Sequence, residues 1–105
     1  MSKTQIAPVG ELTKGEIREV EIDGRHLLLV NGEKGPALID RVCPHLGGDL
    51  AKGKVAANRI RCPIHSYLFD LKTGSCPLGE REGFGPLAVY ELLESEGYLC
   101  VEFSD

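Results

Sequence analysis

The chain has 105 residues, 42% of them hydrophobic, and carries a formal net charge of −4 at pH 7. This length is typical of one domain with a modest core. The acidic balance argues against nucleic acid or an anionic membrane as a partner. No apolar run approaches the roughly 20 residues of a membrane-spanning helix. Residues 1–5 lack the apolar core of a signal peptide, so we expect a cytoplasmic protein.

Alternating apolar and charged residues predict short strands in the first half of the chain. The expected strands cover residues 6–12, 16–22, 26–30 and 36–42. Asp23-Gly24 is a hairpin turn signal, because both central residues of a type I′ turn need a positive φ. Asn31-Gly32 predicts the next turn for the same reason.

The second half continues the pattern of strands and turns. Further strands are expected over residues 54–56, 59–62, 67–71, 87–93 and 98–103. Ala57-Asn58 and Gly97 would form turns, and residues 75–85 are interpreted as a loop. Nowhere do apolar residues recur at helical spacing for three clean turns. Many short strands with regular turns favour an all-β sandwich or barrel-like fold.

Residues 43–65 contain two short segments that each begin with Cys-Pro and have a histidine within the next two residues after the cysteine-proline pair. One residue separates Cys43 from His45, and two separate Cys62 from His65. Two thiols and two imidazoles in matched pairs suit a metal centre. Two glycines follow the first pair, and their backbone can turn sharply and come close to a bound group because glycine has no side chain.

The pattern C-x-H, sixteen residues, then C-x-x-H resembles the Rieske signature. In that family two cysteines bind one iron of a [2Fe–2S] cluster and two histidines bind the other. The resemblance assigns Cys43, His45, Cys62 and His65 as cofactor and metal ligands of one cluster per chain. It implies a Rieske-type antiparallel β-sandwich, a single domain over residues 1–105, with a small cluster-binding subdomain at about 42–70.

Zinc is the alternative metal. Zinc also takes two cysteines and two histidines, but its usual sequence order pairs Cys with Cys and His with His. Here each segment supplies one of each, as the Rieske pattern requires. The thiolate count also explains the redox properties of that family. Two neutral imidazoles replace two charged thiolates, so potentials of about −150 to +300 mV lie above the roughly −400 mV of plant-type ferredoxins.

Several positions depart from the high-potential Rieske proteins of quinol-oxidising complexes. That subfamily carries a disulfide between its ligand loops, and the matching positions here are Gly48 and Ile64. It also uses two hydroxyl donors near the cluster, where this chain has Tyr67 and Phe69. We therefore expect a potential low in the Rieske range. Ser66 replaces the glycine that often follows the second histidine in the ferredoxins.

Other chemically active residues receive structural interpretations. Cys100 is expected to be a small buried hydrophobe in the last strand. Cys76 could be a reactive thiol, but a structural role is favoured. His26 is interpreted as a partly exposed strand residue. Residues 83–88 match G-x-G-x-x-A, yet no strand-to-helix context surrounds them, so a turn is favoured over dinucleotide binding.

The resemblance implies a soluble electron carrier that is not itself catalytic. It would receive single electrons from a flavin-dependent reductase and pass them to a terminal oxygenase of the aromatic-ring dioxygenase type, and we expect a monomer. The alternative is the small Rieske-like subunit of an NAD(P)H nitrite reductase. A third class is an interaction module that binds zinc or no metal, which colour would reveal because an iron–sulfur protein is red-brown.

Overall fold

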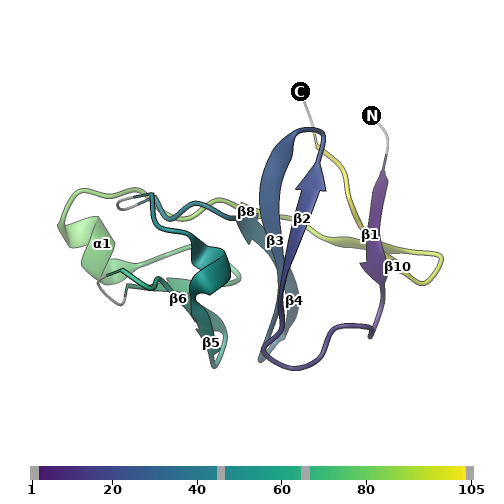
Figure 1. Cartoon of the computed structure of the whole chain (residues 1–105), viewed down its shortest axis with the longest axis horizontal. Helices are drawn as coiled ribbons and strands as arrows, with labels where there is room; N and C mark the ends of the chain where they lie inside the picture. The colour runs from purple at the N-terminus through teal and green to yellow at the C-terminus, as the bar shows by residue number, and fades with distance from the viewer. Residues whose placement is uncertain (1–2, 45–46, 65–66, 104–105) are drawn as a thin grey trace.

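The computed structural model describes residues 3–44, 47–64 and 67–103, and this part of the chain consists mainly of strands (Figure 1). The described strands form three antiparallel sheets. The prediction of an all-β, antiparallel fold is therefore confirmed. No helix in these ranges is long and apolar enough to cross a membrane.

Each sheet is small and is built mainly from hairpins. The outer sheet has the order β1 (Thr4–Pro8), β10 (Tyr98–Val101), β9 (Leu93–Ser95). The central sheet has the order β2 (Ile17–Ile22), β3 (Arg25–Gly32), β4 (Gly35–Asp40), β8 (Val89–Tyr90). The third sheet has the order β5 (Lys54–Ala56), β6 (Arg59–Arg61), β7 (Leu68–Asp70). Two short helices are η1, a 3₁₀ helix (Leu50–Lys52), and α1 (Pro77–Arg81).

The central sheet lies between the other two sheets (Figure 1), and its strands β3 and β4 carry runs of buried residues that face both ways. In β3, Leu28 and Val30 pack into one hydrophobic cluster, while Leu27 and Leu29 pack into another. The first cluster faces β5, β6 and β7 and includes Cys43 and Cys62. The second faces β1 and β10. Side chains alternate between the two faces of a strand, so four consecutive apolar residues supply both cores.

The hairpin turn at Asp23-Gly24 is confirmed, with φ of 51° and 80°. The turn predicted at Asn31-Gly32 is wrong. Both residues belong to β3, whose pairing with β4 continues to Gly32 opposite Gly35. The chain turns two residues later, at 33–34.

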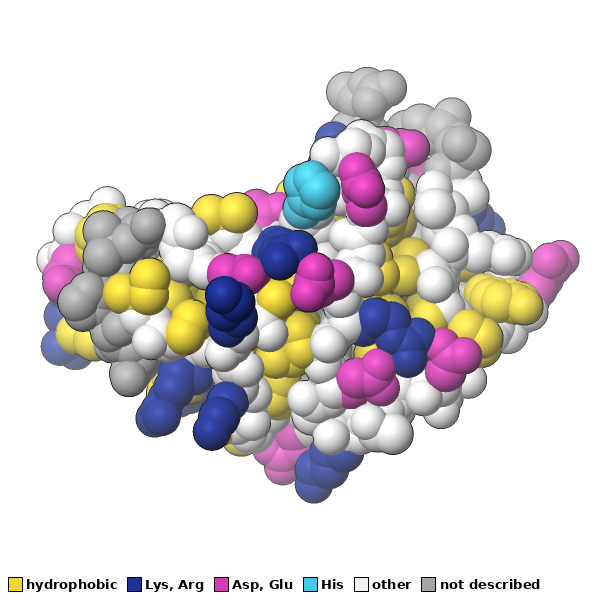
Figure 2. All heavy atoms as spheres, in the orientation of Figure 1, with side chains coloured by type: hydrophobic (Ala, Val, Ile, Leu, Met, Phe, Trp, Pro, Cys, Tyr) yellow, Lys and Arg dark blue, Asp and Glu magenta, His cyan; other side chains and the backbone are white. Residues whose placement is uncertain are grey.

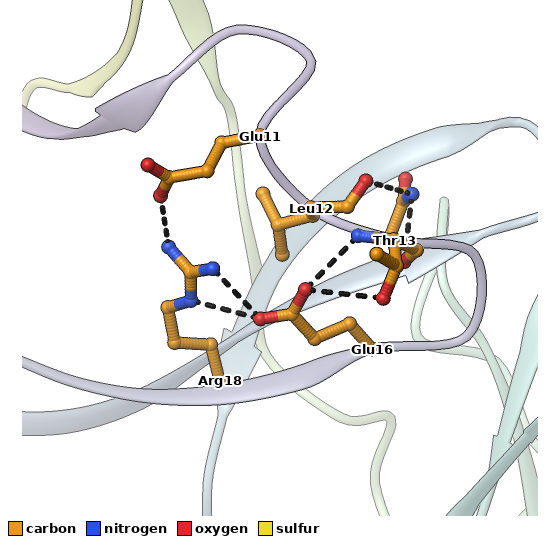
Figure 3. A network of polar contacts seen from close by, with 6 residues as sticks. Glu11, Leu12, Thr13, Glu16 and Arg18 are labelled. Carbon is orange, nitrogen blue, oxygen red and sulfur yellow. Dashed lines mark hydrogen bonds and ion pairs between the residues drawn. The ribbon is translucent and has the colours of Figure 1, made fainter.

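Packing explains the Asn31-Gly32 pair. The Asn31 amide donates hydrogen bonds to the carbonyl oxygens of Leu12 and Thr13, at 3.2 and 3.1 Å. These two bonds fasten the segment before β2, which is also held by bonds from the Thr13 N–H and from Arg18 to the Glu16 carboxylate (Figure 3). A Cβ on Gly32 would lie 2.5 Å from Asn58 Oδ1 and 2.6 Å from Leu71 Cδ1. The glycine is therefore needed for close packing rather than for a turn.

The loop expected over residues 75–85 contains α1, so that part of the prediction is wrong. Pro77 occupies the first turn of the helix, where its missing N–H costs nothing, and Cys76 precedes it in an extended conformation. Glu80 lies in the first turn, where a negative charge is favourable. A helix of five residues is too short to produce a recognisable hydrophobic period.

Strand boundaries differ from the expected ones at both ends of the chain. The opening strand ends at Pro8, before the buried Leu12. The strand expected over residues 87–93 is two separate pieces, β8 and β9, which belong to different sheets. The closing hairpin is as predicted, because Glu96 and Gly97 have positive φ and connect β9 to β10.

Candidate metal centre

Two loops with the same pattern of closing hydrogen bonds carry the paired cysteines. The first follows β4, and the second connects β6 to β7. In the first, the N–H of Cys43 donates to the Gly48 carbonyl at 2.8 Å, and Val42 forms a bridge with Asp49. In the second, the N–H of Cys62 donates to the Tyr67 carbonyl at 2.8 Å, and Arg61 pairs with Leu68. Each loop thus spans six residues and begins with a cysteine. The fold presents the two cysteines in equivalent local settings.

The predicted hairpin between these loops is confirmed. Strands β5 and β6 pair from Lys54–Arg61 to Ala56–Arg59, and Ala57 turns the chain with φ of 53°. A Cβ on Gly53 would lie 2.1 Å from the Arg61 carbonyl oxygen, so the chain entering β5 touches the end of β6. The hairpin therefore returns the second loop to the side of the first.

The thiols of Cys43 and Cys62 come together in the core, each about 1% exposed. Burial is the main cause that raises the pKa of the Cys62 thiol above its ordinary value, opposed by a hydrogen bond from the Ile64 N–H and reinforced by the Cys43 thiol. Two buried thiolates without a counter-charge would repel each other. A bound metal would supply the positive charge that lets both ionise.

The two loops also touch at Gly48. A Cβ at this position would lie 3.1 Å from Ile64 Cδ1 and 3.2 Å from the Cys62 sulfur. The chain thus has a glycine and an isoleucine side by side where the high-potential Rieske proteins are expected to carry a disulfide. None of the four cysteines, all within the described residues, forms a disulfide.

The other two predicted ligands, His45 and His65, lie outside the described residues. Within the described ranges no three His, Cys, Asp or Glu side chains gather as a metal site. Cys76 is 3% exposed and belongs to the same hydrophobic cluster as Cys43 and Cys62. Cys100 is buried in β10, as expected, and His26 is exposed in β3, as expected.

A charged clamp that sequence reasoning missed closes the first loop. Arg41 Nε and Nη2 each bind an Asp49 carboxylate oxygen at 3.0 Å, and Nη1 binds Glu19 on β2 at 2.7 Å. The Arg41 hydrogen bonds lower the pKa of Asp49, helped by the N–H of Ala51 at the start of η1. The only sequence signal is an aspartate before a short helix, a common N-cap.

A second polar contact holds α1 against the second loop. The Tyr67 hydroxyl donates a hydrogen bond to the Glu82 carboxylate at the end of α1. That bond is the first cause that raises the pKa of Tyr67 to about 12, with burial second and the charges of Glu82, Cys76 and Cys43 behind it. Tyr67 thus links the helix to the loop that begins at Cys62.

The described donors fit an iron–sulfur cluster. In a Rieske cluster two cysteine thiolates bind one of the two irons. Cys43 and Cys62 lie buried together here and could supply them. Gly48 leaves room beside the Cys62 sulfur, where any larger residue would press on it. Buried apolar surroundings limit the access of water, which helps to set a redox potential.

Comparisons with known proteins agree with this chemistry. The family model for the Rieske [2Fe-2S] domain matches residues 2–91. The chain is 31% identical over 100 residues to cholesterol 7-desaturase of Hemicentrotus pulcherrimus, covering 87% of this chain and 21% of that protein. It is 34% identical over 74 residues to the oxygenase component of 3-ketosteroid-9-alpha-monooxygenase of Mycolicibacterium smegmatis, covering 70% of this chain and 19% of that protein. The chain thus spans about a fifth of these relatives.

Solved structures share the fold over nearly the whole chain. The Sphingomonas yanoikuyae B1 ferredoxin superposes with a TM-score of 0.82 at 23% identity, covering 98% of this chain and 100% of that one. The ferredoxin of carbazole 1,9a-dioxygenase from Nocardioides aromaticivorans gives a TM-score of 0.80 at 23% identity, covering 96% and 97%. With the family match over most of its length, the chain belongs to the Rieske [2Fe-2S] domain family and carries one [2Fe–2S] cluster.

Proposed function

We propose that this chain is a Rieske-type ferredoxin that carries single electrons from a flavin-dependent reductase to a terminal oxygenase. Cys43, His45, Cys62 and His65 would hold the cluster, which supplies reversible one-electron reduction when bound. The observation that carries the proposal is the pair of buried cysteines in matched loops at one end of the molecule. The chain would act in the cytoplasm and perform no substrate chemistry of its own.

The relatives support an oxygenase as the electron acceptor. One structural neighbour is a complex of reduced oxygenase and oxidised ferredoxin in carbazole 1,9a-dioxygenase, with a TM-score of 0.80 over 94% of this chain. Two sequence relatives are oxygenase components or desaturases that act on steroids by name. Parts of these relatives resemble this chain in sequence, and the structural neighbour pairs a ferredoxin with an oxygenase, which supports an oxygenase as the acceptor.

The residues around the cysteines would protect and position the cluster. Leu50, Ile60, Phe69 and Leu87 pack around them in the first hydrophobic cluster, each at most 2% exposed. The Arg41–Asp49 pair holds the first loop and the Tyr67–Glu82 bond holds the second. A rigid environment keeps ligand geometry similar in the two redox states, which favours fast electron exchange.

Electron paramagnetic resonance of the dithionite-reduced protein tests this function. We expect the low average g value typical of mixed histidine and cysteine ligation, and a reduction potential nearer about −150 mV than +300 mV. Anaerobic reduction by a ferredoxin reductase and reoxidation by a terminal oxygenase should both be fast. A spectrum typical of four cysteine ligands would exclude the ligand set. A stable complex with a sirohaem-containing subunit, without exchange of electrons with an oxygenase, would favour the nitrite reductase subunit.

A further inference from the structure

The third sheet has one apolar face and one charged face. Val55, Ile60 and Phe69 lie on the inner face, where they pack into the core beside the cysteines. The residues between them point outward. We call the exposed side chains of Lys54, Arg59 and Arg61 the basic face.

The basic face contains a like-charge pair that does not help folding. Lys54 and Arg61 lie directly opposite each other on β5 and β6, an arrangement that destabilises a sheet. Among the described residues, neither forms an ion pair, whereas Arg18 and Arg41 each bind two carboxylates. Arg59 is opposite Asp70, whose pKa is lowered mainly by the N–H groups of Lys72 and Thr73 and only weakly by Arg59.

The charge of the chain is unevenly distributed. Residues 42–70 contain four basic side chains and two acidic ones, and Asp49, one of the two acids, is bound to Arg41. The whole chain nevertheless has a net charge of −4. Figure 2 shows Lys and Arg side chains gathered over the end of the molecule that carries β5 and β6, and mixed signs over β2. The local charge beside the cysteines is thus opposite to the net charge.

The basic face lies next to the loop that begins at Cys62. Arg61 immediately precedes Cys62, and Lys54 is its partner across the hairpin. Exposed apolar side chains flank both cysteines, with Val42 56% exposed and Ile64 39% exposed. An apolar centre bordered by charge is the usual composition of a transient protein interface.

We propose that the basic face is a docking surface for an acidic patch on the protein redox partner of this chain. This inference rests on the proposed electron-transfer function. Opposite charges would raise the rate of encounter and orient the partner toward the Cys62 loop. The repulsion between Lys54 and Arg61 is relieved when carboxylates of the partner approach them.

Small charged oxidants test the sign of this surface. The dithionite-reduced protein is mixed with hexacyanoferrate(III), an anion, or with hexaammineruthenium(III), a cation, and each reagent takes one electron from one cluster. If the basic face dominates, the rate with hexacyanoferrate falls as ionic strength rises from about 0.01 M to 1 M, where the Debye length shrinks from about 30 to 3 Å. If net charge dominates, the rate rises instead, which would overturn the proposal.

Lys54→Glu is compared with Lys14→Glu, a control at an exposed position in the segment before β2, outside the basic face. Both variants change the net charge equally. At low salt, Lys54→Glu should lower the rate of cluster oxidation by hexacyanoferrate about fivefold or more. Lys14→Glu should lower that rate less than about twofold. Lys54→Glu also places opposite charges across the hairpin, so its stability should not fall. Equal rate effects would refute a local docking surface, while an unchanged EPR spectrum in both would leave the carrier function standing.

Binding of poly-L-glutamate provides a readout that needs no electron transfer. We expect fluorescently labelled poly-L-glutamate to bind the intact protein at low salt, and Lys54→Glu but not Lys14→Glu to weaken that binding at least about threefold. Double-stranded DNA and phosphatidylserine vesicles are the comparison probes. Tighter binding of either one through Lys54 would assign this face to nucleic acid or lipid and refute an acidic protein partner. Absence of poly-L-glutamate binding would also refute it.

Discussion

Cys43 and Cys62 differ from the other two cysteines in position rather than in burial, because all four are buried. Cys76 packs with its sulfur toward Gly79 of α1, and the Cys100 sulfur contacts the Tyr98 carbonyl at 3.7 Å. Neither contact involves the paired loops. The sequence motif predicted which two thiols meet, and the structure brings those two together. The histidine ligands stay a prediction.

Cysteine-to-serine variants separate ligands from packing residues. Cys43→Ser and Cys62→Ser should each lose most iron, sulfide and visible absorption, and much of the fold, because ligation free energy is partly folding free energy. Cys76→Ser and Cys100→Ser should keep the red-brown colour and lose only modest stability. Iron and sulfide analysis with visible spectra measures this. A bleached Cys76→Ser protein beside a coloured Cys62→Ser protein would contradict the assignment.

Asp49 offers a test of loop positioning and of pH dependence. Its carboxylate binds Arg41 and caps η1. Asparagine keeps a capping oxygen but loses the charge that pairs with Arg41, so Asp49→Asn should lower the free energy of unfolding by at most about 1 kcal/mol at neutral pH. The pKa of Asp49 is lowered in the folded state, so this stabilisation is full above the ordinary value near 3.8 and is lost as pH falls below it. Denaturant unfolding at several pH values would show the variant and the parent converging in acid.

Glu19→Gln is the control for Asp49→Asn. Glu19 contacts the same guanidinium, but its side chain is 60% exposed and caps no helix. The exposed pair should contribute little to stability, so this variant should unfold almost like the parent. Equal losses from both substitutions at every pH would show that Asp49 has no special part in closing the loop.

At the scale of elements, hairpins with a positive-φ turn could be predicted from sequence, and elements defined by distant contacts could not. Asp23-Gly24 formed its turn because the local preference met no competing contact. Asn31-Gly32 has the same local signal, but contacts with residues far along the chain, Leu12 and Asn58, keep it in a strand. The Arg41–Asp49 contact likewise depends on the closed loop, and the local pattern around Asp49 predicts at most a helix cap, not its pairing with Arg41.

Gly74 and Gly83 both have a left-handed backbone conformation, but only Gly74 lies close to another segment. Comparing them tests how β7 packs against the segment that follows α1. Gly74 and Gly83 have φ of 79° and 89°, so both should resist replacement by alanine. A Cβ on Gly74 would lie 1.9 Å from the Leu87 carbonyl oxygen, whereas a Cβ on Gly83 meets nothing within 4 Å. We expect Gly83→Ala to cost about 1 kcal/mol and Gly74→Ala more than about 3 kcal/mol.

Denaturant unfolding measures the difference between the two glycine variants. Leu87 belongs to the hydrophobic cluster around the cysteines, so Gly74→Ala should also release iron faster than the parent. Similar costs for the two variants would mean that the close approach of Gly74 to Leu87 contributes nothing beyond the backbone conformation. Faster iron loss in Gly83→Ala would mean that α1 and its loop control the cluster instead.

On the scale of the whole molecule, β3 and β4 separate two hydrophobic cores that surround different parts of the fold. The first core surrounds the cysteines, and the second joins the central sheet to β1 and β10. In β4, Ala37 and Ile39 face the first core and Leu38 faces the second. Both cores share one sheet, so their stabilities are coupled, while only the first contacts the redox site.

Leu28 and Leu29 test this division, because they are neighbours in β3, are both fully buried, and face opposite cores. Leu28→Ala and Leu29→Ala should each destabilise the fold by about 2–5 kcal/mol, since each leaves a cavity. Only Leu28→Ala should also change the EPR g values and shorten the lifetime of the cluster in air, because its cavity opens beside the cysteines. Unfolding curves and EPR spectra of the two variants provide the comparison. If Leu29→Ala changed the spectrum as much as Leu28→Ala, the second core would have to reach the cluster through the sheet, and the two cores could not be separate units of function.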